Sequence, residues 1–224
     1  MTVTSVSSEL FSATYPPMKA FVHKILLPAL LAAILLLAVR FLLFMHLRIP
    51  EGTEVEGFRS GQHVAVNLNA YGLRLPGEAL WGYCRWGYSR PEEGDRVVCR
   101  YVGSDDLFVA TCRALPADTV WVDPVRQRIL PARTSSDAQP IVVPAQGKRL
   151  TVTPANARLL AYLLRSFEHS RARANAYGQL ELDGRVLRTV SLTSDYYWVE
   201  TRTDSYLLIP HEALVGRALP IGRK

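Results

Sequence analysis

The longest apolar stretch of the chain covers residues 25–45 and carries a single charge, that of Arg40. At about 1.5 Å per residue, a helix of this length spans about 30 Å, the thickness of the hydrocarbon core of a bilayer. A buried soluble helix would show a polar stripe, and this stretch shows none before Arg40. A cleaved signal peptide would end in small residues, whereas the end of this stretch reads "FMHLRIP". The pattern predicts an uncleaved transmembrane anchor over residues 25–47, preceded by a tail of residues 1–24.

The charges beside this anchor predict its orientation. Lys19 and Lys24 precede the apolar stretch, and positive residues next to a span favour the cytoplasmic side. We therefore expect a single-pass protein of a bacterial inner membrane, with a cytoplasmic N-terminus and with residues 48–224 forming a domain in the periplasm. Lipid of the inner membrane is the first partner that the sequence predicts.

After the anchor, the pattern changes to short runs in which apolar and polar residues alternate. This period of two is typical of β-strands, and turn-forming sequences such as "GSDD", "PADT" and "LDGR" separate the runs. The density of such runs predicts an antiparallel β domain. The strand-like runs include "HVAVNL", "DRVVCRYV", "LFVATCRAL", "TVWVDP", "RLTVTP", "QLELDG" and "YYWVET".

One segment of this domain has a helical pattern instead. Thr153 is expected to cap the helix, and Pro154 suits its first turn. An apolar stripe at helical spacing follows, and we expect it to pack on the sheet. The predicted fold class is therefore mainly β: a single N-terminal transmembrane helix, then an antiparallel β domain with one soluble helix near residues 154–171. The stripe consists of Leu159, Leu160, Leu163, Leu164 and Phe167.

The composition narrows the possible functions. Apolar residues make up 49% and charged residues 21%, which fits neither a disordered chain nor one that crosses the membrane many times. The net charge of +6 comes mostly from scattered arginines, and no basic run is interleaved with stacking aromatics. We therefore expect a solvated surface or contact with anionic lipid, and no nucleic-acid partner.

The chain has three cysteines, Cys84, Cys99 and Cys112, so at least one of them is unpaired. A turn at residues 103–106 is expected to place Cys99 opposite Ala110, with Cys112 only diagonal to it. The pairing of Cys99 with Cys112 stays open on this pattern. The sequence has no C-x-x-C motif and no cluster of Cys and His, so we expect neither a metal nor another cofactor.

In their order, several segments after the anchor resemble bacterial type I signal peptidases of the form common among Bacteroidetes-like enzymes. The resemblance runs from the anchor almost to the last residue and depends on the spacing of the segments. It implies a β fold and a serine–lysine dyad that cleaves leader peptides, in which a lysine kept neutral by burial activates the serine. The segments are "RIPEG", "SGQHVAVNLNAYGLRLPGE", "PEEGDRVVCRY", "ALPADTV", "VPAQGKRLTVTPANARLL", "DGRVLRTVSLTSDYYWV" and "IPHEALVGRALPI".

The resemblance places the catalytic positions on residues that do not fit them. The nucleophile falls on Thr53 and the base lysine on Ala110. The hydroxyl donor to the oxyanion falls on Glu51, whose carboxylate would repel the developing charge. Lys148 matches a peripheral part of the family, far from the dyad strands. We therefore assign no catalytic residue and expect a pseudoenzyme.

The resemblance then implies a signal peptidase-like protein that has lost the dyad. We expect a non-cleaving peptide-binding protein or an accessory subunit of protein export or of an envelope complex. Its expected partners are an active signal peptidase, the export translocon or another envelope complex, and an extended leader-like peptide held by β-strand addition. The alternative is an active signal peptidase with an altered mechanism, in which a hydroxyl pairs with a histidine. The residues for that pair are Ser60 or Thr53 with His63, His169 or His211, and we expect the histidines to lie at the surface.

The sequence "LWGYCRWGYSRP", residues 80–91, is a second candidate site. Tryptophan and tyrosine favour the membrane interface and arginine suits lipid phosphates, so the loop fits a surface that rests on the membrane or on a partner. A hairpin that caps the β core explains the same residues, and both interpretations stay open. The candidate contact residues are Trp81, Tyr83, Trp86 and Tyr88.

Overall fold

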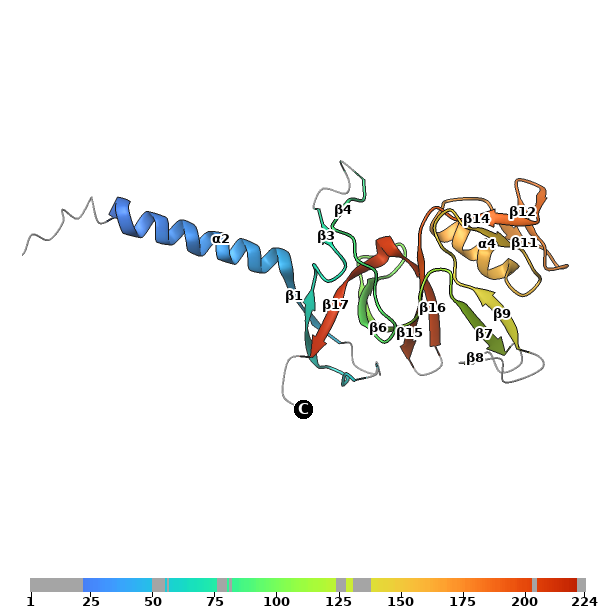
Figure 1. Ribbon diagram of the computed structural model, residues 1–224, viewed down its shortest axis with the longest axis horizontal. Coiled ribbons are helices and arrows are strands. Elements are labelled where there is room, and N and C mark those ends of the chain that lie inside the picture. Colours follow the sequence, from blue (N-terminus) through green and yellow to red (C-terminus); the bar gives the residue numbers. More distant parts are fainter. Residues whose placement is uncertain are drawn as a thin grey trace, which may run out of the picture. The chain divides into compact units, whose positions relative to one another are not determined.

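The computed structural model, drawn in Figure 1, describes residues 22–49, 55, 57–75, 80, 82–123, 128–130, 138–202 and 205–220. The chain forms two compact units, Met1–Leu42 and Leu43–Lys224, and each is described by itself. Three of the candidate residues, Glu51, Thr53 and Trp81, lie outside the described residues.

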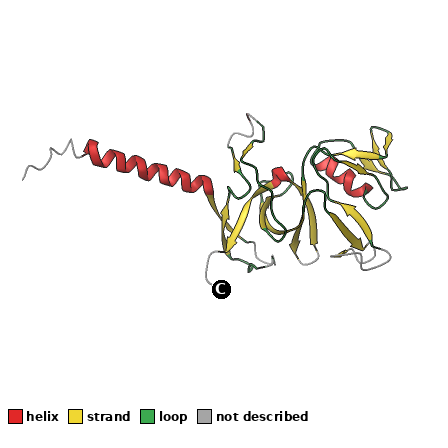
Figure 2. Cartoon of the chain, in the orientation of Figure 1, coloured by secondary structure: helices red, strands yellow, loops and turns green. Residues whose placement is uncertain are grey.

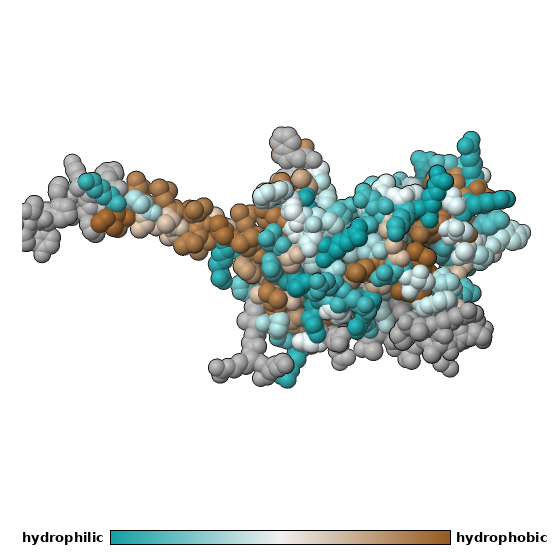
Figure 3. Space-filling model, in the orientation of Figure 1, coloured by the Kyte–Doolittle hydropathy of each residue, from teal (hydrophilic) through white to brown (hydrophobic). Residues whose placement is uncertain are grey.

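The N-terminal unit contains the apolar helix that the sequence predicted. A short π-helical segment, η1 (Val22–Leu26), leads into α2 (Leu27–Leu43). The segment Lys24–Leu43 is long and apolar enough to cross a membrane, and its apolar side chains are exposed along its length (Figure 3). Residues 44–47, which the sequence assigned to the anchor, belong to a strand, because their backbone pairs with the next strand of the chain.

The second unit is mainly β and antiparallel, as the sequence predicted (Figure 2). Within the described residues, its largest sheet has seven strands in the order β1-β2-β17-β5-β6-β15-β16, and all neighbours are antiparallel. In this sheet β1 and β16 each pair on one side, so they are its edges. The strands are β1 (Phe44–Arg48), β2 (His63–Asn67), β5 (Arg96–Arg100), β6 (Leu107–Ala114), β15 (Tyr196–Arg202), β16 (Ser205–Pro210) and β17 (Leu214–Pro220).

Smaller antiparallel sheets flank the large one. The chain leaves the large sheet after β6, builds most of these small sheets together with α4 (Ala157–Ser166), and returns at β15. A three-residue 3₁₀ turn, η2 (His211–Ala213), joins β16 to β17, the last two strands of the large sheet in chain order. The small sheets pair β3 (Leu73–Arg74) with β4 (Arg85–Trp86), β7 (Thr119–Asp123) with β8 (Arg128–Leu130) and β9 (Gln139–Val142), β10 (Arg149–Thr151) with β14 (Thr189–Ser191), and β12 (Leu180–Leu182) with β11 (Arg173–Ala174) and β13 (Arg185–Leu187).

The soluble helix α4 is present but shorter than the predicted segment of residues 154–171. Its N-cap residue is Asn156 instead of Thr153. The Asn156 side chain accepts a hydrogen bond from the Thr153 N–H and donates one to the Thr151 carbonyl, which stabilises a turn ahead of the helix. The apolar stripe of the helix shares a buried core with residues of the large sheet, as the sequence predicted.

Buried apolar clusters hold the second unit together. One joins α4 to β15 and β16, and another lies against β1, β2 and β17. A third cluster joins β5, β6 and β15, and it contains the expected position of the catalytic base, so we refer to it as the Ala110 core. Its buried members are Tyr71, Val97, Cys99, Phe108, Ala110, Cys112, Tyr197, Val199, Ile209 and Leu214.

The cysteine geometry differs from the prediction. The loop between β5 and β6 is longer than a four-residue turn, so Cys99 opposes Phe108 instead of Ala110. Cys112 then lies beyond the diagonal position, and all three cysteines of the chain are free. Burial raises the pKa of Cys99 well above its ordinary value and that of Cys112 to about 12, so both thiols stay protonated.

Candidate functional site

Ala110, the expected position of the base, lies on β6 with its side chain wholly buried. It pairs with Val97 and packs in the Ala110 core among apolar and tyrosine side chains. Of the lysines in the described residues, Lys24 belongs to the N-terminal unit, and Lys148 is exposed in the turn before β10. Within the described part of the second unit, no amine therefore lies in this core to accept a proton.

A groove of about 1230 Å³ is lined by residues that follow the expected nucleophile in the chain. Its walls come from segments far apart in sequence, residues 57–62, 94–96 and 217–220. Ser60, one of the hydroxyls considered for catalysis, belongs to this wall. His63 begins β2 next to the groove, and its side chain is exposed, as the sequence predicted.

Asp95 fixes one wall of this groove. Its Oδ2 atom accepts hydrogen bonds from the Tyr71 hydroxyl (3.2 Å), the Glu92 N–H (3.0 Å) and the Arg217 Nη2 group (2.6 Å). The Asp95 side chain is only 13% exposed, and its contact with Arg217 is an ion pair. Several donors on one carboxylate oxygen hold it in a single position, so the residue that precedes β5 is fixed to the middle of β17 at the groove.

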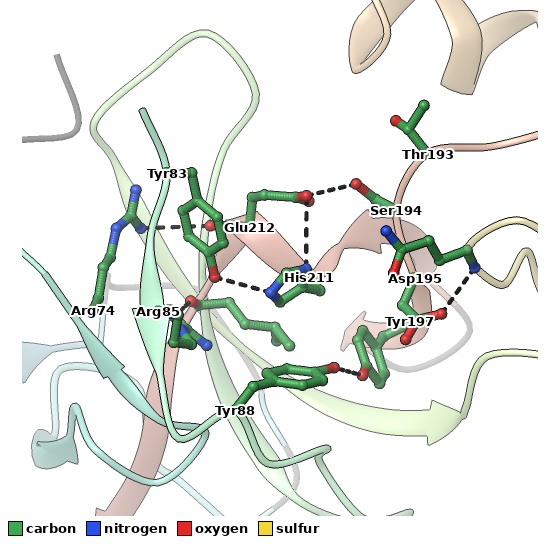
Figure 4. Close-up of polar contacts among 12 residues, drawn as sticks. Arg74, Tyr83, Arg85, Tyr88, Thr193, Ser194, Asp195, Tyr197, His211 and Glu212 are labelled. Atoms are coloured by element: carbon green, nitrogen blue, oxygen red, sulfur yellow. Dashed lines mark hydrogen bonds and ion pairs between the residues drawn. The ribbon is translucent and has the colours of Figure 1, made fainter. Parts of the chain in front are cut away.

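The aromatic loop, residues 80–91, supplies β4 of the hairpin β3–β4, and it is hydrogen-bonded to the Ala110 core. The Arg85 Nη2 group donates to the Leu214 carbonyl (2.5 Å), and the hydroxyls of Tyr88 and Tyr197 are hydrogen-bonded to each other (Figure 4). Leu214 and Tyr197 are both members of that core. The loop is therefore a cap on the β core, one of the two interpretations that the sequence left open.

The same loop also presents apolar side chains outward. Trp86 is 75% exposed and Leu80 is 82% exposed, whereas Tyr83 is half-buried and Tyr88 is 39% exposed. Successive side chains of a strand point to opposite faces, so Arg85 is directed inward and Trp86 outward. Of the candidate contact residues in the described part of the chain, Trp86 is the one best placed to meet a membrane or a partner.

His211 is the centre of a polar cluster that the sequence did not predict (Figure 4). Its Nε2 atom is hydrogen-bonded to the Tyr83 hydroxyl at 3.1 Å. The rings of Tyr83 and Tyr88 meet the imidazole edge-on, with centroids 5.1 and 4.7 Å away. The His211 side chain is 22% exposed, so the expectation of a surface histidine is wrong, because the hairpin β3–β4 covers it.

The cluster does not align a nucleophile with the histidine. Burial lowers the pKa of His211, with Arg85 acting in the same direction and Glu212 in the opposite one, so the ring is neutral near pH 7. The Ser194 hydroxyl donates to Glu212 Oε1 (2.5 Å), and that oxygen lies 3.6 Å from Nδ1 of His211. A serine activated by histidine would instead donate to the imidazole, whose Nε2 here faces Tyr83. The arrangement therefore serves to dock the hairpin.

Asp195 ties further loops to the cluster. Its carboxylate accepts hydrogen bonds from the Arg90 Nη2 group (3.2 Å) and from the Gln146 N–H (2.9 Å), and its carbonyl accepts one from the His211 N–H (2.9 Å). Tyr83 and His211 are 128 positions apart, so no local pattern could have brought them together. The signal available in the sequence was the alternation of Tyr83 and Arg85 with outward-facing residues, which predicts that one face of the loop is buried.

No model of a known protein family matches the chain, and no curated protein is detectably similar to it. These comparisons therefore add no support to the resemblance to signal peptidases. Among the described residues, no group of three or more His, Cys, Asp or Glu side chains is placed to hold a metal ion.

Proposed function

We propose that the chain is a membrane-anchored, signal peptidase-like protein that binds an extended peptide without cleaving it. The observation that carries the proposal is the burial of Ala110, at the expected position of the base, in a core without an amine. A serine or threonine hydroxyl is a poor nucleophile at neutral pH unless a base takes its proton. Removing the nucleophile–base unit of a serine protease costs about six orders of magnitude in rate, so cleavage by this chain would be negligible.

A strained turn supports the relation to signal peptidases. Ala117 has a φ of 76°, a left-handed conformation that alanine seldom adopts. In the resembled family the turn reads Gly-x-Pro-Gly-Asp, and Ala117 stands at the second glycine. Asp118 closes the turn, because its carboxylate accepts a hydrogen bond from the Leu115 N–H (2.8 Å). A backbone conformation that suits glycine at this position favours descent from a turn of that kind.

The groove beside β1 is the proposed place for the peptide. Gly61 and Gln62 line the groove, and both are hydrogen-bonded through their backbones to Ile49, the residue that follows β1. Leu219 also lines the groove and is 39% exposed, so it supplies apolar contact for a peptide side chain.

Peptide binding is tested with a fluorescent leader peptide and the full-length protein in detergent, by fluorescence anisotropy. Leu219→Glu should weaken binding by about tenfold or more, because a bound peptide would desolvate an unpaired carboxylate. Leu207→Glu is the matched control, since Leu207 is 37% exposed and lies on the opposite edge strand, β16. Equal effects of the two substitutions, or no binding by the wild-type protein, would contradict the proposed site.

The absence of cleavage needs a separate assay. Wild-type protein and its Thr53→Ala variant should release the same background amount of product from a leader-peptide substrate, measured by mass spectrometry. The alternative, an active peptidase with an altered mechanism, gains no support from the histidines, because His63 and His169 are exposed and His211 faces Tyr83. Cleavage that depends on Thr53 would establish that alternative and refute the non-cleaving function.

The proposed location is the bacterial inner membrane, with a cytoplasmic N-terminus and the β domain in the periplasm. The helix Lys24–Leu43 supports a membrane location through its length and apolar character. Protease added to intact spheroplasts should therefore degrade the β domain, whereas protection of that domain would reverse the topology. The proposed protein partners are an active signal peptidase, the export translocon or another envelope complex, and cross-linked pull-down from solubilised membranes would distinguish them.

A further inference from the structure

A hollow of about 450 Å³ lies between α4 and β11, and arginines surround it. Arg158 and Arg165 come from α4, and Arg173 comes from β11. Ala161 and Ala174 complete the lining, and their small side chains leave the space between the arginines open. We refer to this feature as the arginine cradle.

The spacing of the arginines follows from the helix. Arg158 and Arg165 are two turns apart, so they project from the same face of α4 on either side of Ala161. Ala161 is 2% exposed and Ala174 packs against the apolar core, so the floor of the cradle is fixed. The Arg165 Nε group donates to the Ala161 carbonyl (3.3 Å), which directs the rest of its guanidinium away from its own helix.

None of these arginines has an acidic partner within the described residues. All three side chains are exposed, and like charges held close together repel one another. Positively charged residues also outnumber acidic ones around the cradle. Residues 138–192 contain eight lysines and arginines and three acidic residues, so this region supplies most of the net charge of +6 of the whole chain. Arginines elsewhere in the described residues do have acidic partners, as in Arg90–Asp195, Arg100–Asp105, Arg113–Glu200 and Arg217–Asp95.

We infer that the arginine cradle binds the phosphate group of an anionic phospholipid. A guanidinium presents parallel N–H donors that match two oxygens of a phosphate, and several guanidinium groups facing one hollow neutralise its charge. The chain also carries a helix long and apolar enough to hold it at a membrane, where lipid phosphates are present at high effective concentration. The inference is independent of peptide binding in the groove beside β1.

The test uses the full-length protein in a zwitterionic detergent, titrated with short-chain phosphatidylglycerol, with short-chain phosphatidylcholine and with inorganic phosphate. Phosphatidylglycerol should bind best, and added salt should weaken it. Changing Arg158, Arg165 and Arg173 together to glutamine should weaken that binding by at least about tenfold. Changing the same three residues to lysine keeps the charge and should cause a smaller loss, because lysine lacks the planar fork.

The matched control changes Arg149, Arg185 and Arg188 together to glutamine. These exposed arginines belong to the same region but do not line the hollow, so the variant has the same net charge with the cradle intact. Its affinity for phosphatidylglycerol should stay within about twofold of the wild-type value. Equal weakening in the control would show diffuse electrostatic attraction, and equal binding of phosphatidylcholine or of inorganic phosphate would show a different ligand; each result would overturn the inference. Thermal unfolding of all three variants shows whether they are folded.

Discussion

Replacing Ala117 by glycine should stabilise the β domain. With its φ of 76°, Ala117 occupies a left-handed conformation that costs an L-residue about 1–2 kcal/mol. Glycine adopts this conformation without that cost but loses about 0.5–1 kcal/mol more conformational entropy on folding than alanine does. The hydrogen bond from the residue-117 N–H to the Val143 carbonyl (2.9 Å) is backbone only and survives the change. The free energy of unfolding should therefore rise by about 0.5–1 kcal/mol.

A second alanine-to-glycine change provides the control. Ala70 is also half-buried in a turn, but its φ is not positive. Ala70→Gly should therefore lower the free energy of unfolding by about 0.5–1 kcal/mol, because glycine loses more conformational entropy on folding and the change relieves no strain. Urea unfolding of the full-length protein in detergent, followed by tryptophan fluorescence, measures both variants. A change of 1 kcal/mol corresponds to a shift of about 2–4 °C in the thermal midpoint of a domain of this size.

The sign of the change in the free energy of unfolding caused by Ala117→Gly shows whether Ala117 is strained. If both substitutions lower the urea midpoint by similar amounts, Ala117 is not strained. The turn would then lose its value as a sign of descent from a glycine-containing signal peptidase turn, and the proposed relation would rest on the order of the sequence segments alone.

Further predictions concern the hairpin cluster and the groove. Burial lowers the pKa of His211 in the folded state, whereas the imidazole of the unfolded chain takes up a proton near pH 6.5. Because protons then bind more readily to the unfolded chain, the free energy of unfolding should fall as the pH drops below about 6.5. Urea midpoints at about pH 7.5 and 5.5 should show that His211→Gln removes this loss and His63→Gln retains it; equal slopes in all three proteins would contradict the docking role. Trp86→Ala should change the free energy of unfolding by less than about 0.5 kcal/mol, and Tyr83→Ala should lower it by about 1–3 kcal/mol, in the same urea assay. Asp95→Ala should cost about 1–3 kcal/mol, because it removes the shared acceptor of three donors while Arg217 stays partly exposed to solvent; a loss below about 0.5 kcal/mol would show that water replaces the carboxylate.

The elements that the sequence predicted correctly are those set by local patterns. The apolar stretch that forms α2 and the alternating runs that form strands can be recognised locally, because the residues that determine each element are neighbours in the chain. The start of α4 was misplaced because the side chain of Asn156 forms a competing turn with Thr153. The position of Cys99 was misplaced because loop length, which local pattern leaves open, sets the register of the hairpin β5–β6.

The candidate site shows the same division. The run from Phe108 to Cys112 is buried on both faces of β6, and its mostly apolar sequence already favoured a core position for Ala110. The contact between Tyr83 and His211 could not be predicted from the sequence, because it joins a loop near the start of the β domain to the turn between β16 and β17. A histidine after a proline at a strand end has no local feature that distinguishes a solvated ring from one covered by a distant loop.

The free cysteines make the β domain independent of redox chemistry. Because no disulfide crosses its strands, the domain needs no oxidant to reach its folded state, and a reductant removes nothing that holds it together. Cys99 and Cys112 are sealed in the core as protonated thiols, which slows their oxidation even in an oxidising compartment. Cys84 is exposed on the hairpin loop, between Tyr83 and Arg85, and so offers a single natural attachment point for a reporter that would record whether the hairpin stays docked.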